Sequence, residues 1–250
     1  MSIYYRSSHA ELISLTGHTF AYPPHSHVSV YTIGVLLHGA MELRQGHENR
    51  LVHAGEWFVA PPYAVHSLVP RGGADMLTLC IHRDIVLGSA DISLMDAADE
   101  ILLPLLGNGL TNREAHTLVM DGVDSLLSRR DAPQPLCCPY IADARRLLEQ
   151  HPGEIFSTDQ LTKNTLVGKD QLIRRFKKEL GLTPRRFLLQ NRIRMAQRLI
   201  EQEMPITEVA QAAGFYDQSH FDKRFHYLMG ISPQAYRKAV RAIPVSTGPV

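Results

Sequence analysis

Two histidines near the start of the chain have a spacing that suits ligand binding. His25 and His27 stand in the segment PPHSH, residues 23 to 27. Alternate residues of an extended strand point to the same side, so both rings are expected on one face. Imidazole nitrogens bind Zn, Ni, Co and Fe. The pair therefore predicts metal ligands, the wall of an organic effector pocket, or two hydrogen-bonded core groups.

The elements that position these histidines read as short β-strands. Turn sequences such as GlyAla and ArgGlyGly separate the strand-like segments, which occupy residues 28 to 37, 41 to 44, 50 to 53, 57 to 60 and 76 to 81. Such regular spacing predicts a small sandwich or barrel. Residues 92 to 128 then follow a helical pattern with an apolar stripe, expected either to pack on the barrel or to form a dimer surface.

A second segment of this region carries a family resemblance. Residues 55 to 66, GEWFVAPPYAVH, together with residues 23 to 27, resemble the two motifs of the cupin barrel. The resemblance implies a third imidazole and a divalent transition metal, with the ligand set His25, His27 and His66. Tyr31 and Thr32 stand where a cupin has a carboxylate ligand. The barrel cavity is also the expected effector site, with candidate walls His25, His27, Tyr31, Trp57 and His66.

The charge of the chain is divided between its halves. The formal net charge is +1, but residues 1 to 139 carry a net charge of −6 and residues 140 to 250 a net charge of +7. Such an asymmetry suggests that one half meets a polyanion. The proline-rich segment 129 to 139 between them reads as a linker. We therefore expect a first domain over residues 1 to 128 and a second over residues 140 to 243.

The second half contains one sequence pattern twice. RRFKKELGLTP at residues 174 to 184 aligns with KRFHYLMGISP at 223 to 233, forty-nine residues further on. Each copy reads as helix, turn and helix. Gly214 suits the turn, and Gly181 and Gly230 suit the ends of the second helices. Residues 185 to 202 read as a linker helix, so the pattern predicts two similar modules on a helical connector.

Paired helices with a short turn are typical of DNA-binding modules. The first helix braces the second, which presents its polar face to the major groove. Two modules on a rigid linker would reach successive grooves on one side of the duplex, about 34 Å apart. The other interpretation is a helical bundle whose basic residues form only a solvated face.

The repeat carries a second resemblance. Residues 206 to 237, ITEVAQAAGFYDQSHFDKRFHYLMGISPQAYR, closely resemble the signature of the AraC/XylS family of transcriptional regulators. This implies a seven-helix DNA-binding domain, usually C-terminal to a sensing and dimerisation domain. The first copy departs from the family pattern at Thr162 and Gly168. The groove-facing positions implied by the alignment are Asp170, Ile173, Arg174, Gln218, Ser219, Asp222 and Lys223.

Further basic residues of the second half are expected to contact phosphate or only solvent; they are Lys169, Lys177, Lys178 and Arg237.

No run of residues is apolar enough for a membrane span, and three cysteines are too few for a disulfide framework, so a cytoplasmic protein is expected.

The resulting expectation is an α+β protein of two domains that binds double-stranded DNA, responds to a small molecule or metal, and forms a homodimer, with RNA polymerase as a further partner. The alternatives are a regulator whose barrel only dimerises and a metal-dependent cupin enzyme. No nucleophile motif or phosphate loop accompanies the histidines, so we expect no catalysis.

Overall fold

The computed structural model divides the chain into two compact units. One comprises Met1–Ala132 with Lys238–Val250, and the other Pro133–Arg237. The structure describes residues 2–6, 10–27, 30–82, 138–154, 156–163 and 167–242. The expected helical segment 92 to 128 lies outside the described residues, as does most of the expected linker. Residues from Lys238 onward belong by their contacts to the first unit, whereas the sequence boundary keeps them in the second domain.

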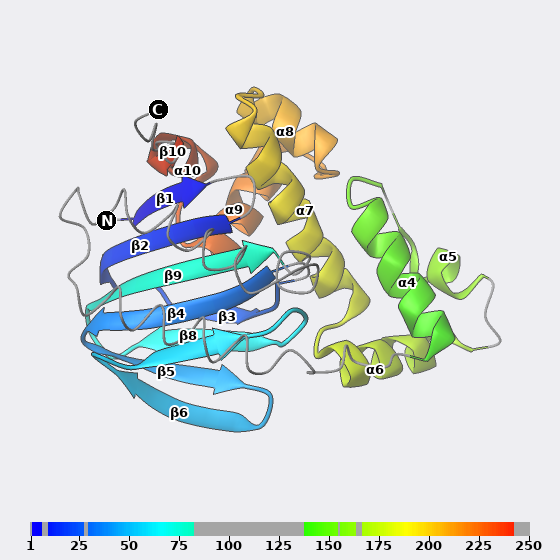
Figure 1. The fold of residues 1–250 in the computed structure, drawn as a ribbon. Helices are drawn as coiled ribbons and strands as arrows, with labels where there is room; N and C mark the ends of the chain where they lie inside the picture. Colours follow the sequence, from blue (N-terminus) through cyan, green and yellow to red (C-terminus); the bar gives the residue numbers. More distant parts are fainter. Residues whose placement is uncertain are drawn as a thin grey trace, which may run out of the picture. The chain divides into compact units, whose positions relative to one another are not determined.

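The first unit is built from two sheets (Figure 1). The larger sheet has the strand order β10-β1-β2-β9-β4-β7, and the smaller has the order β3-β8-β5-β6. Neighbouring strands are antiparallel except for β1 and β10. The strands are β1 (Ser2–Arg6), β2 (Ala10–His18), β3 (Tyr22–His25), β4 (Val30–His38), β5 (Ala40–Gln45), β6 (Glu48–His53), β7 (Trp57–Ala60), β8 (His66–Pro70), β9 (Ala74–His82) and β10 (Val240–Ala242).

An apolar core lies between the two sheets. It takes Leu36 and Phe58 from the larger sheet and Met41, Leu43 and Leu68 from the smaller. Burial of one such side chain contributes about 1.5–3 kcal/mol. The strand pairings of the described residues form two sheets rather than one closed barrel, so the first unit is a sandwich-like arrangement. With the helical second unit, the expected α+β class is confirmed.

The second unit is helical, with colours running from green to red in Figure 1. None of the helices in the described part of the chain is both long and apolar enough to cross a membrane. The helices are α4 (Pro139–Gln150), α5 (Thr158–Thr162), α6 (Lys169–Leu180), α7 (Pro184–Glu201), α8 (Ile206–Ala212), α9 (Gln218–Met229) and α10 (Pro233–Ala239).

The helix ends follow the local sequence. Ser157 and Gln160 form a reciprocal capping box at the start of α5, which satisfies two donors that the first turn leaves open. Gly181 and Gly230 end α6 and α9, each with φ of 72°. This left-handed conformation costs glycine little because it has no Cβ atom. The expected helix ends at Gly181 and Gly230 are therefore confirmed.

The duplication extends from the sequence to the packing. Phe176 of α6 meets Phe187 of α7 edge to face, with ring centroids 5.5 Å apart. Phe225 of α9 meets Tyr236 of α10 in the same way, again at 5.5 Å. Each pair joins a second helix to the helix that follows it, and such pairs add about 0.5–1.5 kcal/mol beyond area burial. The helical unit thus contains one packed module twice.

A close backbone contact joins the loop after α4 to the turn of the second module. Gly214 has φ of 76°, and a Cβ atom there would clash with the carbonyl oxygen of Gly153. Arg192 of α7 donates to the carbonyls of Pro152 (2.9 Å) and Glu154 (2.8 Å). Burial lowers the pKa of Arg192. These contacts hold the loop, the connector helix and the second turn together.

Candidate functional site

One face of α6 gathers the predicted DNA contacts of the first module. Ile173 and Arg174 each lie three or four residues from both Asp170 and Lys177, so the four residues share one side of the helix. Ile173 is half-buried and the other three are exposed. The opposite side, with Leu172, Phe176 and Leu180, is buried. The hydrophobic stripe therefore turns this polar face toward solvent.

Two basic residues next to this face are held in ion pairs. Arg175 is paired with Glu179, whose other oxygen accepts from the Cys138 amide at 3.0 Å. Burial acts to raise the pKa of Glu179, but hydrogen bonds from Arg175 and Cys138 outweigh it and lower that pKa. Lys169 pairs with Asp159 of α5 at 2.6 Å. Arg175 thus anchors α6 to the start of α4, and Lys169 links α5 to α6.

The second module presents a corresponding face on α9. Asp217 caps the helix, because its Oδ1 accepts from the amide of His220 at 2.7 Å. Gln218, Ser219 and Lys223 are exposed, while Phe221 and Phe225 are fully buried on the other side. The capping role of Asp217 was not predicted, although an Asp before a helix is a recognisable signal.

The corresponding position of the first module is Gly168, the N-cap of α6, which makes no side-chain hydrogen bond. Thr162, the other departure from the family pattern, donates its hydroxyl to the carbonyl of Asp159 at 3.1 Å. Residues 164 to 166 of this turn lie outside the described residues. The first module therefore has a less firmly capped second helix than the other.

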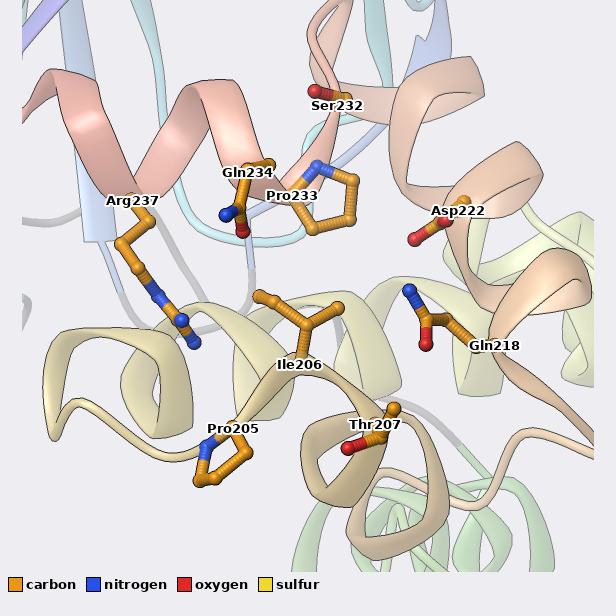
Figure 2. Close-up of a pocket in the computed structure, with 9 residues that line it drawn as sticks. All are labelled: Pro205, Ile206, Thr207, Gln218, Asp222, Ser232, Pro233, Gln234 and Arg237. Atoms are coloured by element: carbon orange, nitrogen blue, oxygen red, sulfur yellow. The ribbon is translucent and has the colours of Figure 1, made fainter.

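Asp222 is half-buried, unlike the exposed residues of this face of α9, and it lines a pocket of about 440 Å³ (Figure 2). The pocket lies between α9 and the first residues of α8 and α10, and Gln218 lines it too. Asp222 Oδ1 is buried and has no hydrogen-bond partner among the described atoms. Arg237 borders the same pocket and donates to the carbonyl of Met204. Gln218 is thus an exposed residue of the pocket lining, whereas Asp222 and Arg237 are half-buried.

The three histidines of the first unit meet between the sheets. His25 ends β3, His66 begins β8, and these two residues are register partners. The ligand nitrogens of His25, His27 and His66 all lie within 4.8 Å of one another. Ring centroids are 4.3 Å apart for His25 and His66, 5.2 Å for His25 and His27, and 5.3 Å for His27 and His66. His66 is 2% exposed, and the other two are half-buried.

Backbone groups orient this three-histidine cluster. The Nδ1–H of His25 donates to the carbonyl of Pro23 at 2.8 Å, and the Nδ1–H of His66 donates to that of Ala64 at 3.1 Å. In this tautomer the lone pair is on Nε2, the arrangement found in metal-binding histidines. The carbonyl of His27 accepts from the amide of Tyr63 at 2.7 Å. Tyr63, which was not predicted, is buried and has φ of 65°, a strained conformation typical of functional sites.

Tyr31 and Trp57 do not join the histidines. Val35 pairs with Trp57 in the register of β4 and β7, and Leu36 and Phe58 face the core between the sheets. Because side chains alternate along a strand, Tyr31, Val35 and Trp57 share the opposite face of the larger sheet. The structure therefore separates these two expected pocket walls from the three-histidine cluster.

One aromatic side chain lies next to the cluster. Tyr22 lies 6.1 Å from His25 between ring centroids, and it stacks on His18 at 5.1 Å. Burial raises the pKa of Tyr22 and lowers that of His18. Glu11 of β2 is half-buried, pairs in register with Cys80, and shares the inner face with Ile13 and Leu15. Tyr22 thus borders the cluster, and Glu11 lies on the inner face of the larger sheet.

Comparison with known proteins agrees with both units. Residues 9–115 match the model of the AraC-like ligand binding domain, and residues 161–239 match a helix-turn-helix domain model. The chain therefore carries an AraC-like ligand binding domain followed by a helix-turn-helix domain, and the resemblance to the AraC/XylS family expected from residues 206 to 237 is confirmed.

The relatives match only part of the chain. The probable transcriptional regulator LumQ of Photobacterium leiognathi is 35% identical over 95 residues, which are 38% of this chain and 38% of LumQ. The transcriptional activator RhaS of Shigella boydii is 32% identical over 92 residues, 36% of this chain and 33% of RhaS. The chain thus aligns with less than two fifths of the length of these relatives.

The structure of ToxT from Vibrio cholerae, solved with an unsaturated fatty acid bound, has a similar fold. Its TM-score is 0.57 at 13% identity, and the match covers 92% of this chain and 95% of ToxT.

Proposed function

We propose that the chain is a sequence-specific DNA-binding transcriptional regulator. The observation that carries this proposal is the module repeated in the helical unit, each copy of which turns a polar face outward from a buried aromatic pair. Second helices of such modules enter the major groove. Two faces on one rigid unit can read two successive grooves.

The exposed faces suggest how sequence would be read. Arg174 donates a bidentate pair to a guanine edge, and Gln218 pairs with adenine. Ser219 and Lys223 also face outward on α9, and Asp170 and Ile173 complete the face of α6. Asp222 orients its neighbours from within the pocket or accepts from a base amine. Lys177 and Lys178 contact phosphate.

The first unit binds an effector that biases DNA binding. Its site is the three-histidine cluster, and the effector is a small molecule or a metal ion. An effector shifts the DNA-bound population only by as much as its affinity for the DNA-binding conformation differs from its affinity for the other conformation. A homodimer, contacts with RNA polymerase and a cytoplasmic location complete the proposal; the chain acts on transcription rather than as an enzyme.

The alternative within the same family is a regulator whose first unit only dimerises. The convergence of three histidines favours an effector site, because imidazoles with a purely structural role do not need their ring nitrogens to point to one common position. Thermal unfolding of the full chain with candidate metabolites or metal ions separates the two interpretations. A ligand that prefers the native state raises the unfolding temperature, and a chain that only dimerises responds to none of them.

Fluorescence anisotropy with duplexes from the chain's own promoter region tests the DNA-binding proposal. We expect tight binding that weakens steeply as salt rises, because phosphate contacts release counterions. Random duplexes of equal length serve as the control. Absence of salt-sensitive binding, with and without cell extract to supply an effector, would overturn the proposal.

A further inference from the structure

Strand β6 forms a free edge of the smaller sheet. Among the described residues it pairs with β5 alone and is the last strand of that sheet (Figure 1). Ala54, just after β6, donates its amide to the carbonyl of Gly39, and residues that bond to the neighbouring strand alternate along an antiparallel pair. The peptide groups of the even-numbered residues of β6 therefore face β5, whereas those of Asn49 and Leu51 face away from it.

The outward peptide groups are closed at only one end of β6. His53 donates its amide to the Glu56 carboxylate at 2.8 Å, and its carbonyl accepts from the Glu56 amide at 3.0 Å. The outward groups of Asn49 and Leu51 meet no such partner in the described part of the chain. The Leu51 side chain is also 44% exposed. An edge of this kind can add an extended peptide through main-chain hydrogen bonds.

Two arginines give the neighbouring sheet face a positive charge. Arg44 donates to Oε1 of Glu42 at 2.8 and 2.6 Å, and Arg71 donates to Oε2 at 2.5 Å. The hydrogen bond from Arg44, with the nearby charge of Arg71, lowers the pKa of Glu42. Both arginine side chains nevertheless remain exposed, at 62% and 63%. One carboxylate balances only one of the two guanidinium groups, so the face keeps an excess of positive charge.

A pocket of about 400 Å³ joins this charge to the open edge. It is lined by Glu42, Asn49, Arg50, Leu51 and Arg71. Arg50 is exposed and donates from Nη2 to the carbonyl of Trp57 at 3.0 Å. Because a guanidinium carries several N–H donors, Arg50 and Arg71 both keep donors for a ligand. An open strand edge, an apolar side chain and guanidinium groups thus border one pocket.

The occupant that fits this pocket is an extended acidic peptide. Carboxylates form strong paired hydrogen bonds with guanidinium groups, and a peptide backbone can pair with Asn49 and Leu51. A nucleic acid duplex has no strand of peptide groups to add to the edge. Glu48 and Glu56, which are exposed at the two ends of β6, also repel a long row of phosphates.

We propose that the edge of β6 docks an extended acidic segment of a partner protein, with its backbone on Asn49 and Leu51 and its carboxylates on Arg50 and Arg71. This surface is separate from the three-histidine cluster and from the outward faces of α6 and α9. A regulator bound at its operator would hold such a partner beside the promoter.

Fluorescence anisotropy of the full chain with a labelled peptide of alternating glutamate and valine tests the proposal. We expect saturable binding that weakens as salt rises, because exposed charges are screened. A peptide with lysine in place of glutamate lacks the carboxylates, and a glutamate peptide with N-methylated amides lacks the main-chain donors, so neither should bind. Equal binding of all three peptides, or no saturable binding of the first, would refute the proposal.

Leu51→Pro separates docking from folding. The Leu51 amide faces away from β5, and proline is tolerated at edge positions of this kind. The variant should bind the glutamate peptide at least about fivefold more weakly, because it loses a main-chain hydrogen bond. Circular dichroism and the urea midpoint verify that it is folded.

Arg50→Gln tests the charge without changing the backbone. Loss of one exposed ion pair should weaken peptide binding by up to about fivefold. Glu48→Gln is the matched control, because Glu48 is exposed on β6 but does not line the pocket, and it should not weaken binding. Unchanged peptide affinity in Arg50→Gln, or in folded Leu51→Pro, would overturn the proposal.

A second copy of the chain is the competing occupant of this edge. Sedimentation of wild type and Leu51→Pro distinguishes the two cases. The same oligomeric state in both supports docking of another protein, whereas a wild-type dimer that becomes monomeric in Leu51→Pro would make the edge a homodimer interface and the proposal wrong. Neither measurement uses DNA, so failure here leaves the proposed regulatory function untouched.

Discussion

Adjacent arginines on α6 have different partners and therefore different roles. Arg175 is paired with Glu179, which also holds the amide of Cys138. Arg174 is exposed on the face shared with Asp170 and Lys177. Only Arg174 can present its whole guanidinium to DNA without breaking an ion pair that anchors the helix.

Arg174→Ala should lower affinity mainly for the cognate sequence. The loss of one bidentate contact corresponds to about 1–3 kcal/mol of discrimination. Anisotropy titrations with cognate and random duplexes measure the two affinities separately. An equal loss on both would show that Arg174 is not a base reader.

Lys177→Ala should weaken binding to all sequences alike. Loss of one phosphate contact reduces the slope of log affinity against log salt by about one. Titrations at several salt concentrations give that slope. Lys169→Ala, which removes a lysine already paired with Asp159, is the control and should change the slope less.

At the scale of the element, two turn positions occupied by glycine differ in whether they require glycine. Gly214 needs its positive φ and its lack of a Cβ atom, because the backbone of Gly153 lies against it. Gly168 has φ of −72°, and a Cβ atom at that position would meet nothing within 4 Å. Only the first of them is required by the fold.

Gly214→Ala should destabilise the helical unit by about 1–3 kcal/mol, because both the backbone conformation and the contact with Gly153 would be strained. Urea unfolding followed by circular dichroism of the helices measures the change. An unaltered midpoint would mean that the turn can relax without loss.

Gly168→Ser should stabilise the same unit by about 0.5–1 kcal/mol. Serine supplies the missing N-cap acceptor of α6 and restricts the unfolded chain. The same urea experiment measures the change. Gly46→Ser would not serve as a control, because Gly46 has φ of 60°, a conformation that is strained for serine. A lower midpoint for Gly168→Ser would contradict the cap argument.

Local signals explain why much of the helical unit could be predicted. Capping residues, the terminal glycines Gly181 and Gly230, and helical apolar spacing all act over a few residues. The predicted strands correspond to β4 to β7 and β9 for the same reason. The segment expected to be extended around His25 corresponds to β3, but β1, β2, β8 and β10 were not predicted. Strand β10, for example, pairs with β1 at the other end of the sequence, which no local pattern reveals.

The candidate sites show the same limit. The meeting of His25, His27 and His66 was expected from motif resemblance, and the structure brings them together. Tyr31 and Trp57 were grouped with them, but a shift of one residue along a strand changes the face. The burial of Asp222 depends on α8 and α10, which no spacing within α9 reveals.

At the scale of the whole molecule, the connector helix fixes the distance between the modules. Helix α7 has 18 residues, a length of about 27 Å at the usual helical rise. Arg192 attaches it to the loop after α4 at two carbonyls. A connector of fixed length requires the operator to carry two sub-sites, one for each module, at a single spacing on the same side of the duplex.

Insertion of about five base pairs between the two sub-sites should therefore reduce binding to the level of a single module, since it moves the second sub-site to the opposite side of the duplex. Quantitative footprinting on the altered operator measures protection of each half. Full protection of both halves would mean that the modules move independently.

The matching aromatic pairs, Phe176 with Phe187 and Phe225 with Tyr236, also bear on how binding preference changes over generations. Since each copy is held by its own pair, substitutions on one outward face leave the other copy's packing intact. One half of an operator can then be exchanged for a new sequence while the other half keeps the protein on the promoter.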